Sequence, residues 1–524
     1  MNPLRSVLSV ALSLLLSVSA TAAALSLLLS VSATAAAPTK PITGAQPNII
    51  FILTDDQGYG DISAHGNPIL KTPHLDRLRA DGVRFTDFHV SPTCSPTRSA
   101  LFTGRHEFKN GITHTILERE RMTLAATTLP QVLQSAGYTT GIFGKWHLGD
   151  EAAYQPNRRG FDEVYIHGGG GIGQIYPGSC GDAPGNTYFN PTLLHNGKFE
   201  KTSGYCTDLF YAQATQWIDA QRRAKKPFFA YIPSNTPHGP YIARPEDRAL
   251  YEGKGLEPAT ENFFGMIHNI DQNIGRLLAK IDEWGIAQNT LVIFMNDNGG
   301  TAGVKVFNAD MRGQKGSAWL GGTRASSFWR WPGTLQAADC SVLSAHIDFF
   351  PTIAAIAGAK IPSAVAQSQI EGRSLVPVLQ NPAAKLPDRY QFTHFGRWPK
   401  LGDPNEAKFK VTSVRNTRWA MVSENGGRTP NWQLFDLSVD YGQKNDVIAQ
   451  HPAVVKELSA AFDQWWAECL PLMVNEKAMG PAINPFQEIY YRQFGGSPTP
   501  EALAKMDPKG ALTFGVPKAG KKKQ

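Results

Sequence analysis

The sequence has few charged residues and no repeating glycine or proline pattern. Charged residues make up 18% of its 524 residues and hydrophobic ones 42%, which excludes global disorder and allows a sizeable core. Its 49 glycines and 36 prolines follow no fixed period, which excludes collagen-like and low-complexity architectures. The net charge of +7 is small and diffuse, and no basic stripe or recognisable module indicates a nucleic-acid partner. The length suits one large α/β domain and a smaller one.

Only the N-terminus carries an apolar run long enough to span a bilayer. Its segment ALSLLLSVSATAA occurs twice, at residues 11–23 and 24–36. We interpret residues 1–37 as a secretory signal with a duplicated apolar region, cleaved after Ala35 or Ala37. The alternative is an uncleaved membrane anchor, which is less favoured because no stop-transfer charge cluster follows. We therefore expect an exported protein, periplasmic or secreted, with no membrane attachment after cleavage.

Cysteine is also scarce, and its number is odd. The five residues are Cys94, Cys180, Cys206, Cys340 and Cys469, so at least one is unpaired in an exported protein. Four cysteines can pair in three ways. Cys180 with Cys206 is the preferred pair because the two lie within one loop-rich region.

Short apolar runs that end in polar, Gly- or Pro-marked sequence alternate with segments of helical periodicity. The predicted strands are Asn48–Thr54, Thr139–Phe143, Pro227–Ile232 and Leu291–Met295. The predicted helices are Leu129–Ala136, Leu209–Arg222 and Asn262–Trp284. This alternation indicates a large, mostly parallel α/β sheet flanked by helices, which we assign to residues 45–380. Functional groups in such sheets gather beyond the carboxyl ends of the strands.

The pattern changes after about residue 380. Short, Trp-rich strands are predicted at Arg418–Ser423 and Asn431–Leu437, and a closing helix near Pro452–Glu468. We interpret residues 381–524 as a smaller α+β domain that ends in a basic tail. The glycine run Gly168–Gly171 precedes no helical pattern and is predicted to be a loop and not a phosphate cradle.

Oxygen-rich side chains follow two of the predicted strands. Asp55 and Asp56 come directly after the first, and the run 296–300 (NDNGG) follows the fourth. Adjacent carboxylates repel each other unless a cation or a basic partner is close. Each cluster alone is more often a turn, but the ends of neighbouring strands converge, which favours a metal site. Such ligands suit Ca²⁺ or Mg²⁺ better than zinc.

Five motifs occur in the order seen in a known family. Residues 94–98 (CSPTR) match the signature C-x-P-x-R of the formylglycine-dependent sulfatases, of the arylsulfatase type and the alkaline-phosphatase-like superfamily. The other four are residues 144–149 (GKWHLG), 236–240 (TPHGP), 297–299 (DNG) and 312–316 (RGQKG). The resemblance runs from about Pro47 to Trp466 and includes LFDLSVD at 434–440.

The resemblance implies hydrolysis of sulfate esters with a reactive group made from Cys94. A formylglycine-generating maturation enzyme would oxidise Cys94 to formylglycine (3-oxoalanine), which also accounts for an unpaired cysteine. The hydrated aldehyde is a geminal diol, with one hydroxyl to attack sulfur and a second to expel the sulfate. One Ca²⁺ would be held by residue 94 together with Asp55, Asp56, Asp297 and Asn298.

Basic residues of the motifs complete the implied site. Arg98 would hold the diol, and Lys145 and Lys315 would bind the sulfate oxygens. His147 would be the base that collapses the sulfated diol, and His238 would face the leaving oxygen as acid or hydrogen-bond donor. The residues interpreted as structural are His65, His74, His89, His106, His114, His167, His268, His346 and Asp348.

One position departs from the family pattern, because Leu320 stands where related sequences carry Glu. This leaves open the hydrogen bonding behind Lys315. Two other functions remain: a phosphonate monoester or phosphodiester hydrolase on the same scaffold, and an inactive relative that binds sulfated glycans. The GKWHLG and TPH loops favour sulfate, and the unbroken motif set disfavours the inactive relative. Aryl sulfates, sulfated glycans and smaller sulfated metabolites are all candidate substrates, because specificity depends on loops such as Gly168–Tyr205.

Overall fold

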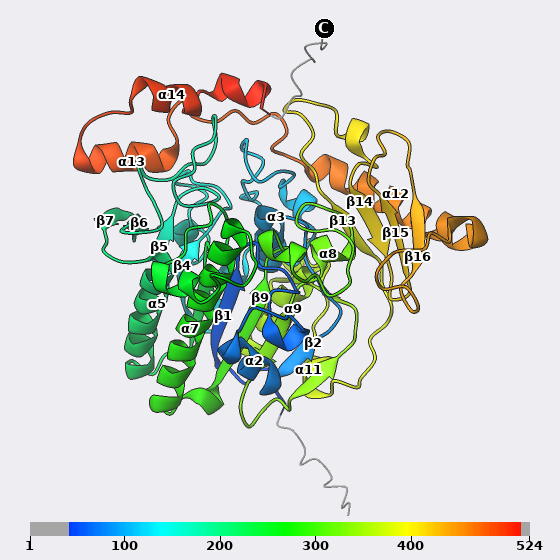
Figure 1. The fold of residues 1–524 in the computed structure, drawn as a ribbon, viewed down its shortest axis with the longest axis horizontal. Helices are drawn as coiled ribbons and strands as arrows, with labels where there is room; N and C mark the ends of the chain where they lie inside the picture. Colours follow the sequence, from blue (N-terminus) through cyan, green and yellow to red (C-terminus); the bar gives the residue numbers. More distant parts are fainter. Residues whose placement is uncertain (1–40, 515–524) are drawn as a thin grey trace, which may run out of the picture. The chain divides into compact units, whose positions relative to one another are not determined.

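A computed structural model describes residues 41–514. Its main feature is a ten-stranded sheet with helices on both faces (Figure 1). The strands of this sheet are β1 (Asn48–Thr54), β2 (Val83–Phe85), β4 (Thr139–Lys145), β5 (Glu163–His167), β6 (Thr192–His195), β7 (Lys198–Lys201), β8 (Phe228–Pro233), β9 (Thr290–Asn296), β10 (Ser327–Arg330) and β11 (Ala338–Cys340). Their order across the sheet is β11-β2-β10-β9-β1-β8-β4-β5-β6-β7.

The centre of the sheet is parallel. β1 lies between β9 and β8, β8 pairs with β4, and β4 with β5, all in parallel register. β10 runs antiparallel between β9 and β2, and β6 and β7 add an antiparallel hairpin at the other edge. The predicted large, mostly parallel sheet flanked by helices is therefore confirmed.

Both faces of the central strands are buried. Phe51 and Leu53 of β1 join the core on one face, and Ile50 and Ile52 join the core on the other. This alternation requires helices on each side, which is why β1 reads as a continuous apolar run. The helices of the large domain are α2 (Pro73–Ala80), α3 (Cys94–Thr103), α4 (Leu129–Gln134), α5 (Cys206–Arg223), α6 (Pro245–Ala249), α7 (Pro258–Glu283), α8 (Leu320–Thr323), α9 (Phe349–Ala357), α10 (Ser363–Ser368) and α11 (Val376–Gln380).

A smaller antiparallel sheet follows. Its strands, in order, are β13 (Gln391–His394), β14 (Thr412–Arg415), β15 (Trp419–Ser423) and β16 (Gln433–Asp436). Helix α12 (Pro452–Cys469) packs its Phe462, Trp465 and Trp466 on this sheet. The predicted smaller C-terminal α+β domain is confirmed, and its boundary near residue 380 stays a prediction. Helices α13 (Pro485–Phe494) and α14 (Pro500–Met506) come last.

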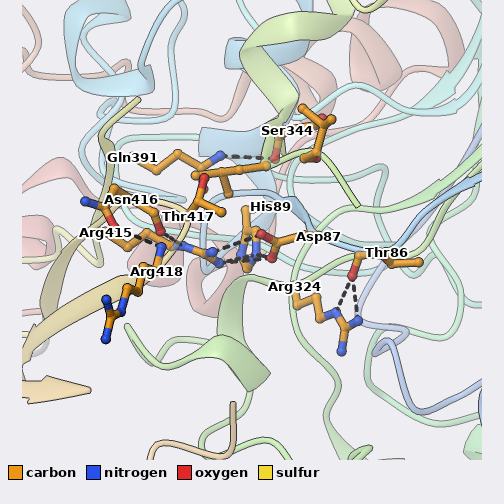
Figure 2. Close-up of polar contacts among 12 residues, drawn as sticks. Thr86, Asp87, His89, Arg324, Ser344, Gln391, Arg415, Asn416, Thr417 and Arg418 are labelled. Carbon is orange, nitrogen blue, oxygen red and sulfur yellow. Dashed lines mark hydrogen bonds and ion pairs between the residues drawn. The ribbon is translucent and has the colours of Figure 1, made fainter. Parts of the chain in front are cut away.

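Polar contacts join the small sheet to a separate two-stranded sheet of the large domain. Arg415 of β14 donates two hydrogen bonds to Asp87, at 3.1 and 2.9 Å, just before the short strand β3 (Phe88–His89). Gln391 of β13 donates to the carbonyl of Ser344 at 3.0 Å, in the strand β12 (Ser344–Ala345) that pairs with β3 (Figure 2). The segment between β13 and β14 is therefore held in place relative to the large domain.

The predicted disulfide is wrong, because all five cysteines are free and buried. Cys206, at the start of α5, packs in the core beneath that helix, whereas Cys180 packs against Ile116 and Leu117 in a separate cluster. Closeness in sequence does not bring the two thiols together.

Residues 1–40, which hold the predicted signal, lie outside the described residues. Among residues 41–514, no helix combines the length and the apolar character needed to cross a membrane.

Candidate active site

The candidate residues gather where four adjacent strands end. Asp55 and Asp56 follow β1, Asp297 follows β9, and Lys145 is the last residue of β4. The loop after β8 carries His238. Because β9, β1, β8 and β4 are neighbours and parallel, their carboxyl ends meet at one edge of the sheet.

The two carboxylates after β1 each have a lysine partner. The Lys145 ammonium lies 2.5 Å from Asp55 Oδ2, and both side chains are fully buried. The Lys315 ammonium lies 2.5 Å from Asp56 Oδ1. Asp56 has a left-handed backbone, with φ of 69°, and its amide donates to Asp297 Oδ1 at 3.2 Å. The repulsion expected between neighbouring carboxylates is thus offset by basic partners.

Arg98 and Asp297 form a second buried pair. The Arg98 guanidinium donates to Asp297 Oδ2 from Nε at 3.2 Å and from Nη2 at 2.8 Å, and neither side chain is exposed. Its Nη1 donates to the carbonyl of Lys145 at 3.1 Å. Arg98 therefore links helix α3 to the ends of β9 and β4.

Two buried oxygens of this cluster lack partners among the described residues, and they test whether a cation fits. Asp55 Oδ1 and Asn298 Oδ1 are buried without a hydrogen bond. The amide nitrogen of Asn298 donates to Asp56 Oδ1 at 3.1 Å, so its Oδ1 is the atom left without a partner. Ligand atoms of Asp55, Cys94 and Asp297 lie within 4.8 Å of one another. Buried oxygens without partners are costly unless a cation binds them, so this donor set fits a hard cation such as Ca²⁺.

The acidity of the carboxyls reflects burial. Burial raises the pKa of Asp55 to about 6, against the opposing charge of Lys145. Burial and the charge of Asp55 raise the pKa of Asp297 to about 6. Burial acts in the same direction on Asp56, but Lys315, His238 and the hydrogen bond from Asn298 together outweigh it and hold the pKa of that carboxyl below its ordinary value. A cation at this site would favour the ionised form of all three carboxyls.

Cys94 occupies the first position of α3 and reaches the same cluster. Burial acts to raise the pKa of its thiol, but Lys145 and Lys315 outweigh burial and lower that pKa. The helix N-terminus also favours negative charge on this side chain. Cys94 Sγ lies 3.4 Å from His147 Nδ1. The group at position 94 is thus held between an imidazole and the carboxylates.

The orientation of His147 is tightly fixed. Its Nε2 donates to the carbonyl of Thr115 at 2.7 Å, which leaves Nδ1 free to accept from residue 94. Burial and the charge of Lys145 lower the pKa of His147 well below its ordinary value, so the ring is neutral at pH 7. A Cβ on Gly170 would lie 2.9 Å from the imidazole. The predicted glycine loop therefore leaves room for this ring.

His238 lies on the other side of the cluster. Its Nδ1 donates to the carbonyl of Gly239 at 2.7 Å, and its Nε2 lies 3.8 Å from Asp56 Oδ2. Burial lowers the pKa of His238 to about 4, although the charge of Asp56 opposes the change. Nε2 is therefore the nitrogen that His238 directs at the reacting groups.

A cavity of about 550 Å³ opens above these residues. Cys94, His147, His238 and Lys315 line it together with residues outside the five motifs. The residues that the motifs missed include His114, Thr115, Gln174, Tyr176, Phe395, Arg397 and Lys410. His114 was expected to be structural, yet it faces the cavity, whereas none of the other histidines interpreted as structural lines it. None of these residues belongs to a motif, but Gln174 and Tyr176 lie in the loop Gly168–Tyr205 that was predicted to govern specificity.

Leu320 fits its surroundings. It begins α8, and its side chain packs in an apolar cluster with Met311, Trp319 and Phe435. Its backbone amide donates to Gln443 Oε1 at 2.9 Å. Lys315 keeps its contact with Asp56, so an apolar residue at this position does not remove that ion pair.

Comparison with known proteins agrees with this geometry. The family model described as Sulfatase matches residues 47–359. Arylsulfatase A of Bos taurus is 32% identical over 80% of this chain and 86% of its own length. The solved structure of Ps i-CgsB in complex with k-i-k-neocarrahexaose has 30% identity and a TM-score of 0.69, and the match covers 80% of this chain and 92% of that one.

A more distant structure shares the fold. The phosphonate monoester hydrolase SpPMH from Silicibacter pomeroyi has 20% identity and a TM-score of 0.55, over 81% of this chain and 96% of that one. That likeness shows a common architecture and nothing about substrate. Given the family model and the arylsulfatase relatives, the chain belongs to the sulfatase family, sulfuric ester hydrolases of the alkaline-phosphatase-like superfamily.

Proposed function

We propose that the protein hydrolyses sulfate esters with residue 94, converted to formylglycine by a maturation enzyme, as its nucleophile. The observation that carries this proposal is the position of Cys94. It begins α3, contacts His147 and lies within reach of Asp55 and Asp297 at the base of the cavity. The hydrated formylglycine supplies two hydroxyls, one to attack sulfur and one whose deprotonation expels sulfate.

We further propose that Asp55, Asp56, Asp297 and Asn298, with residue 94, hold one Ca²⁺. The two buried oxygens without partners support this assignment. When bound, the cation would polarise the sulfate oxygens and favour ionisation of the diol.

The remaining roles follow from the contacts of each side chain. Lys145 and Lys315 place two ammonium groups beside the carboxylates, where they can bind sulfate oxygens as charge builds up. Arg98 ties the ends of β9 and β4 together through Asp297 and the Lys145 carbonyl, and from the same helix as residue 94 we propose that it stabilises the charge of the diol. His147, neutral and with Nδ1 toward residue 94, accepts a proton there. His238 donates from Nε2 to the leaving oxygen once the bound anion raises its pKa.

The substrate and the location of the protein are also proposals. Ps i-CgsB, at 30% identity, was solved with k-i-k-neocarrahexaose, which supports a glycan sulfate ester as the substrate of this chain. We propose that residues 1–37 direct export to the periplasm or the medium, and that residues 45–380 carry the catalysis.

Peptide mass spectrometry of the native exported protein tests the nucleophile. We expect the peptide that contains residue 94 to be about 18 Da lighter than its cysteine form, because a thiol becomes an aldehyde. The same preparation should cleave a sulfate ester faster than the phosphate ester of the same alcohol. A thiol that persists despite a competent maturation enzyme would contradict the mechanism, and a faster phosphate reaction would favour the phosphonate-hydrolase alternative.

A substitution at Gly170 tests the role of His147. Gly170→Ala places a methyl group 2.9 Å from Cε1 and Nε2 of the His147 imidazole, and this Nε2 already donates to the Thr115 carbonyl, so the ring must move to relieve the contact. We expect kcat to fall by roughly 10- to 100-fold, because small misplacements of a reacting group have effects of that size. Gly427→Ala is the matched control, since its backbone is not left-handed and its Cβ would lie at an ordinary 3.4 Å from the carbonyl oxygen of Glu406. Equal activities of the two variants would argue against a catalytic His147.

A further inference from the structure

The cavity is also lined by positively charged side chains that the proposed reaction does not use. Arg397 and Lys410 line it, and neither belongs to a motif. Both lie in the segment that connects β13 to β14 of the small sheet. Cys94 and Lys315 line the same cavity from the large domain. A molecule held at residue 94 therefore lies within the cavity that these two cations also line.

The Arg397 guanidinium has little to bind within the protein. Of its five N–H donors, one is paired among residues 41–514, from Nη2 to the Thr115 hydroxyl at 2.9 Å. Its Nε is buried and has no hydrogen-bond partner among the described residues. Within residues 41–514, neither Arg397, which is half-buried, nor Lys410, which is exposed, forms an ion pair, whereas the buried Arg119 and the half-buried Arg389 each have one.

The position of Arg397 is nevertheless well defined. Its amide donates to the carbonyl of Thr113 at 3.0 Å, and its guanidinium lies 4.6 Å from the centre of the Phe395 ring. Thr115 accepts from Arg397 through its hydroxyl and from His147 through its carbonyl. Arg397 is thus separated by a single residue from the imidazole that contacts position 94.

These contacts fix the position of the Arg397 side chain, and its Nε–H has no hydrogen-bond partner among the described residues. We propose that Arg397, assisted by Lys410, binds a second anionic group, a sulfate or a carboxylate, on the alcohol part of the sulfate ester. The planar guanidinium suits either group, because both accept two parallel hydrogen bonds. A cavity of about 550 Å³ has the size of sites that enclose more than the sulfate group alone. This proposal rests on the proposed function and narrows its substrate to polyanionic esters.

The test uses the mature exported enzyme and three disaccharides. One carries a single sulfate ester, and the others add a second sulfate or a carboxylate on the adjoining sugar. The measured quantity is the ratio of kcat/KM for each dianionic ester to that for the monosulfate. We expect this ratio to exceed one in the native enzyme and to fall roughly 10- to 100-fold in Arg397→Met, as charge-assisted hydrogen bonds are lost.

Three further variants keep the test decisive. Lys410→Met should lower the ratio by a smaller factor, and the exposure of this side chain means that folding is not at risk. Arg397→Lys should keep part of the ratio. Arg418→Met is the matched control, because Arg418 lies on the exterior and pairs with Asp436 at 2.7 Å, so its ratio should equal that of the native enzyme.

The outcomes separate this inference from the proposed function. A ratio that stays unchanged in Arg397→Met, or that does not exceed one in the native enzyme, overturns the inference while sulfate-ester hydrolysis stands. Failure of the native enzyme on all three esters, with residue 94 converted, would instead refute the proposed function. The ester that gives the larger ratio identifies the second group as sulfate or carboxylate.

Discussion

Replacement of Cys94 by alanine is expected to reduce turnover of a sulfate ester by at least about 10⁴-fold, because the variant has no nucleophile. The Cys94 thiol takes no part in the ion pairs of Asp55 with Lys145 and of Asp297 with Arg98. Alanine at this buried position therefore leaves both pairs intact. Steady-state hydrolysis with a chromogenic sulfate ester measures the loss. Circular dichroism should show the same fold as the native protein.

Serine at the same position should behave differently from alanine. Cys94→Ser offers one hydroxyl where the hydrated formylglycine has two, so we expect at most one equivalent of alcohol released per enzyme and then no turnover. Rapid-mixing measurement of the released alcohol tests this. Cys340→Ala is the control, since Cys340 is equally buried but lies in β11 at the sheet edge. Full multiple turnover by the serine variant would show that the diol is not needed.

Removal of the cation should affect stability as well as activity. We expect a chelator to abolish hydrolysis and to lower the melting temperature by roughly 3–4 °C, since a ligand at 100 to 1,000 times its Kd adds about 3–4 kcal/mol and a chain of this length unfolds with a large entropy change. Added Ca²⁺ should restore both. The physical reason is that Asp55 Oδ1 and Asn298 Oδ1 have no protein partner among the described residues. Calorimetry with and without chelator gives the shift.

The pH dependence of that shift has a definite sign. Without the cation, burial raises the pKa of Asp55 and Asp297 to about 6, so the folded state binds protons more readily than the unfolded state. The chelated protein therefore gains stability as pH falls from 7 through 6 toward 4. Protons compete with the cation over the same range, so the difference in melting temperature between the loaded and chelated protein should shrink.

Two variants test whether this difference belongs to the cluster. Asp297→Asn should abolish the response to Ca²⁺. Asp271→Asn should keep it, because Asp271 is also buried with a pKa raised to about 7 but accepts from the amides of His74 and Leu75, at α2. An unaltered Ca²⁺ response in Asp297→Asn would mean that the cation binds elsewhere.

Local patterns predicted the core of the fold. The bounds of β1 agree with the structure, and those of α12 differ by one residue, because a continuous apolar run or a 3.6-residue repeat specifies each. Helix α3 was not predicted, since its polar and apolar residues are all buried and no apolar face alternates with an exposed one. Strand β10 was not predicted either. Its antiparallel direction could not be predicted from its own residues, because strand direction depends on the neighbouring strands.

The sequence by itself determined the parallel sheet, the smaller C-terminal domain and the motifs that identify the family, because each is encoded in a short stretch of chain. Only the tertiary structure decided which charges meet. Lys145 pairs with Asp55 and Arg98 with Asp297 across 90 and 199 residues. It also left all five cysteines unpaired and brought Arg397 to the cavity. Such contacts depend on the closure of long loops by packing, which no local pattern encodes.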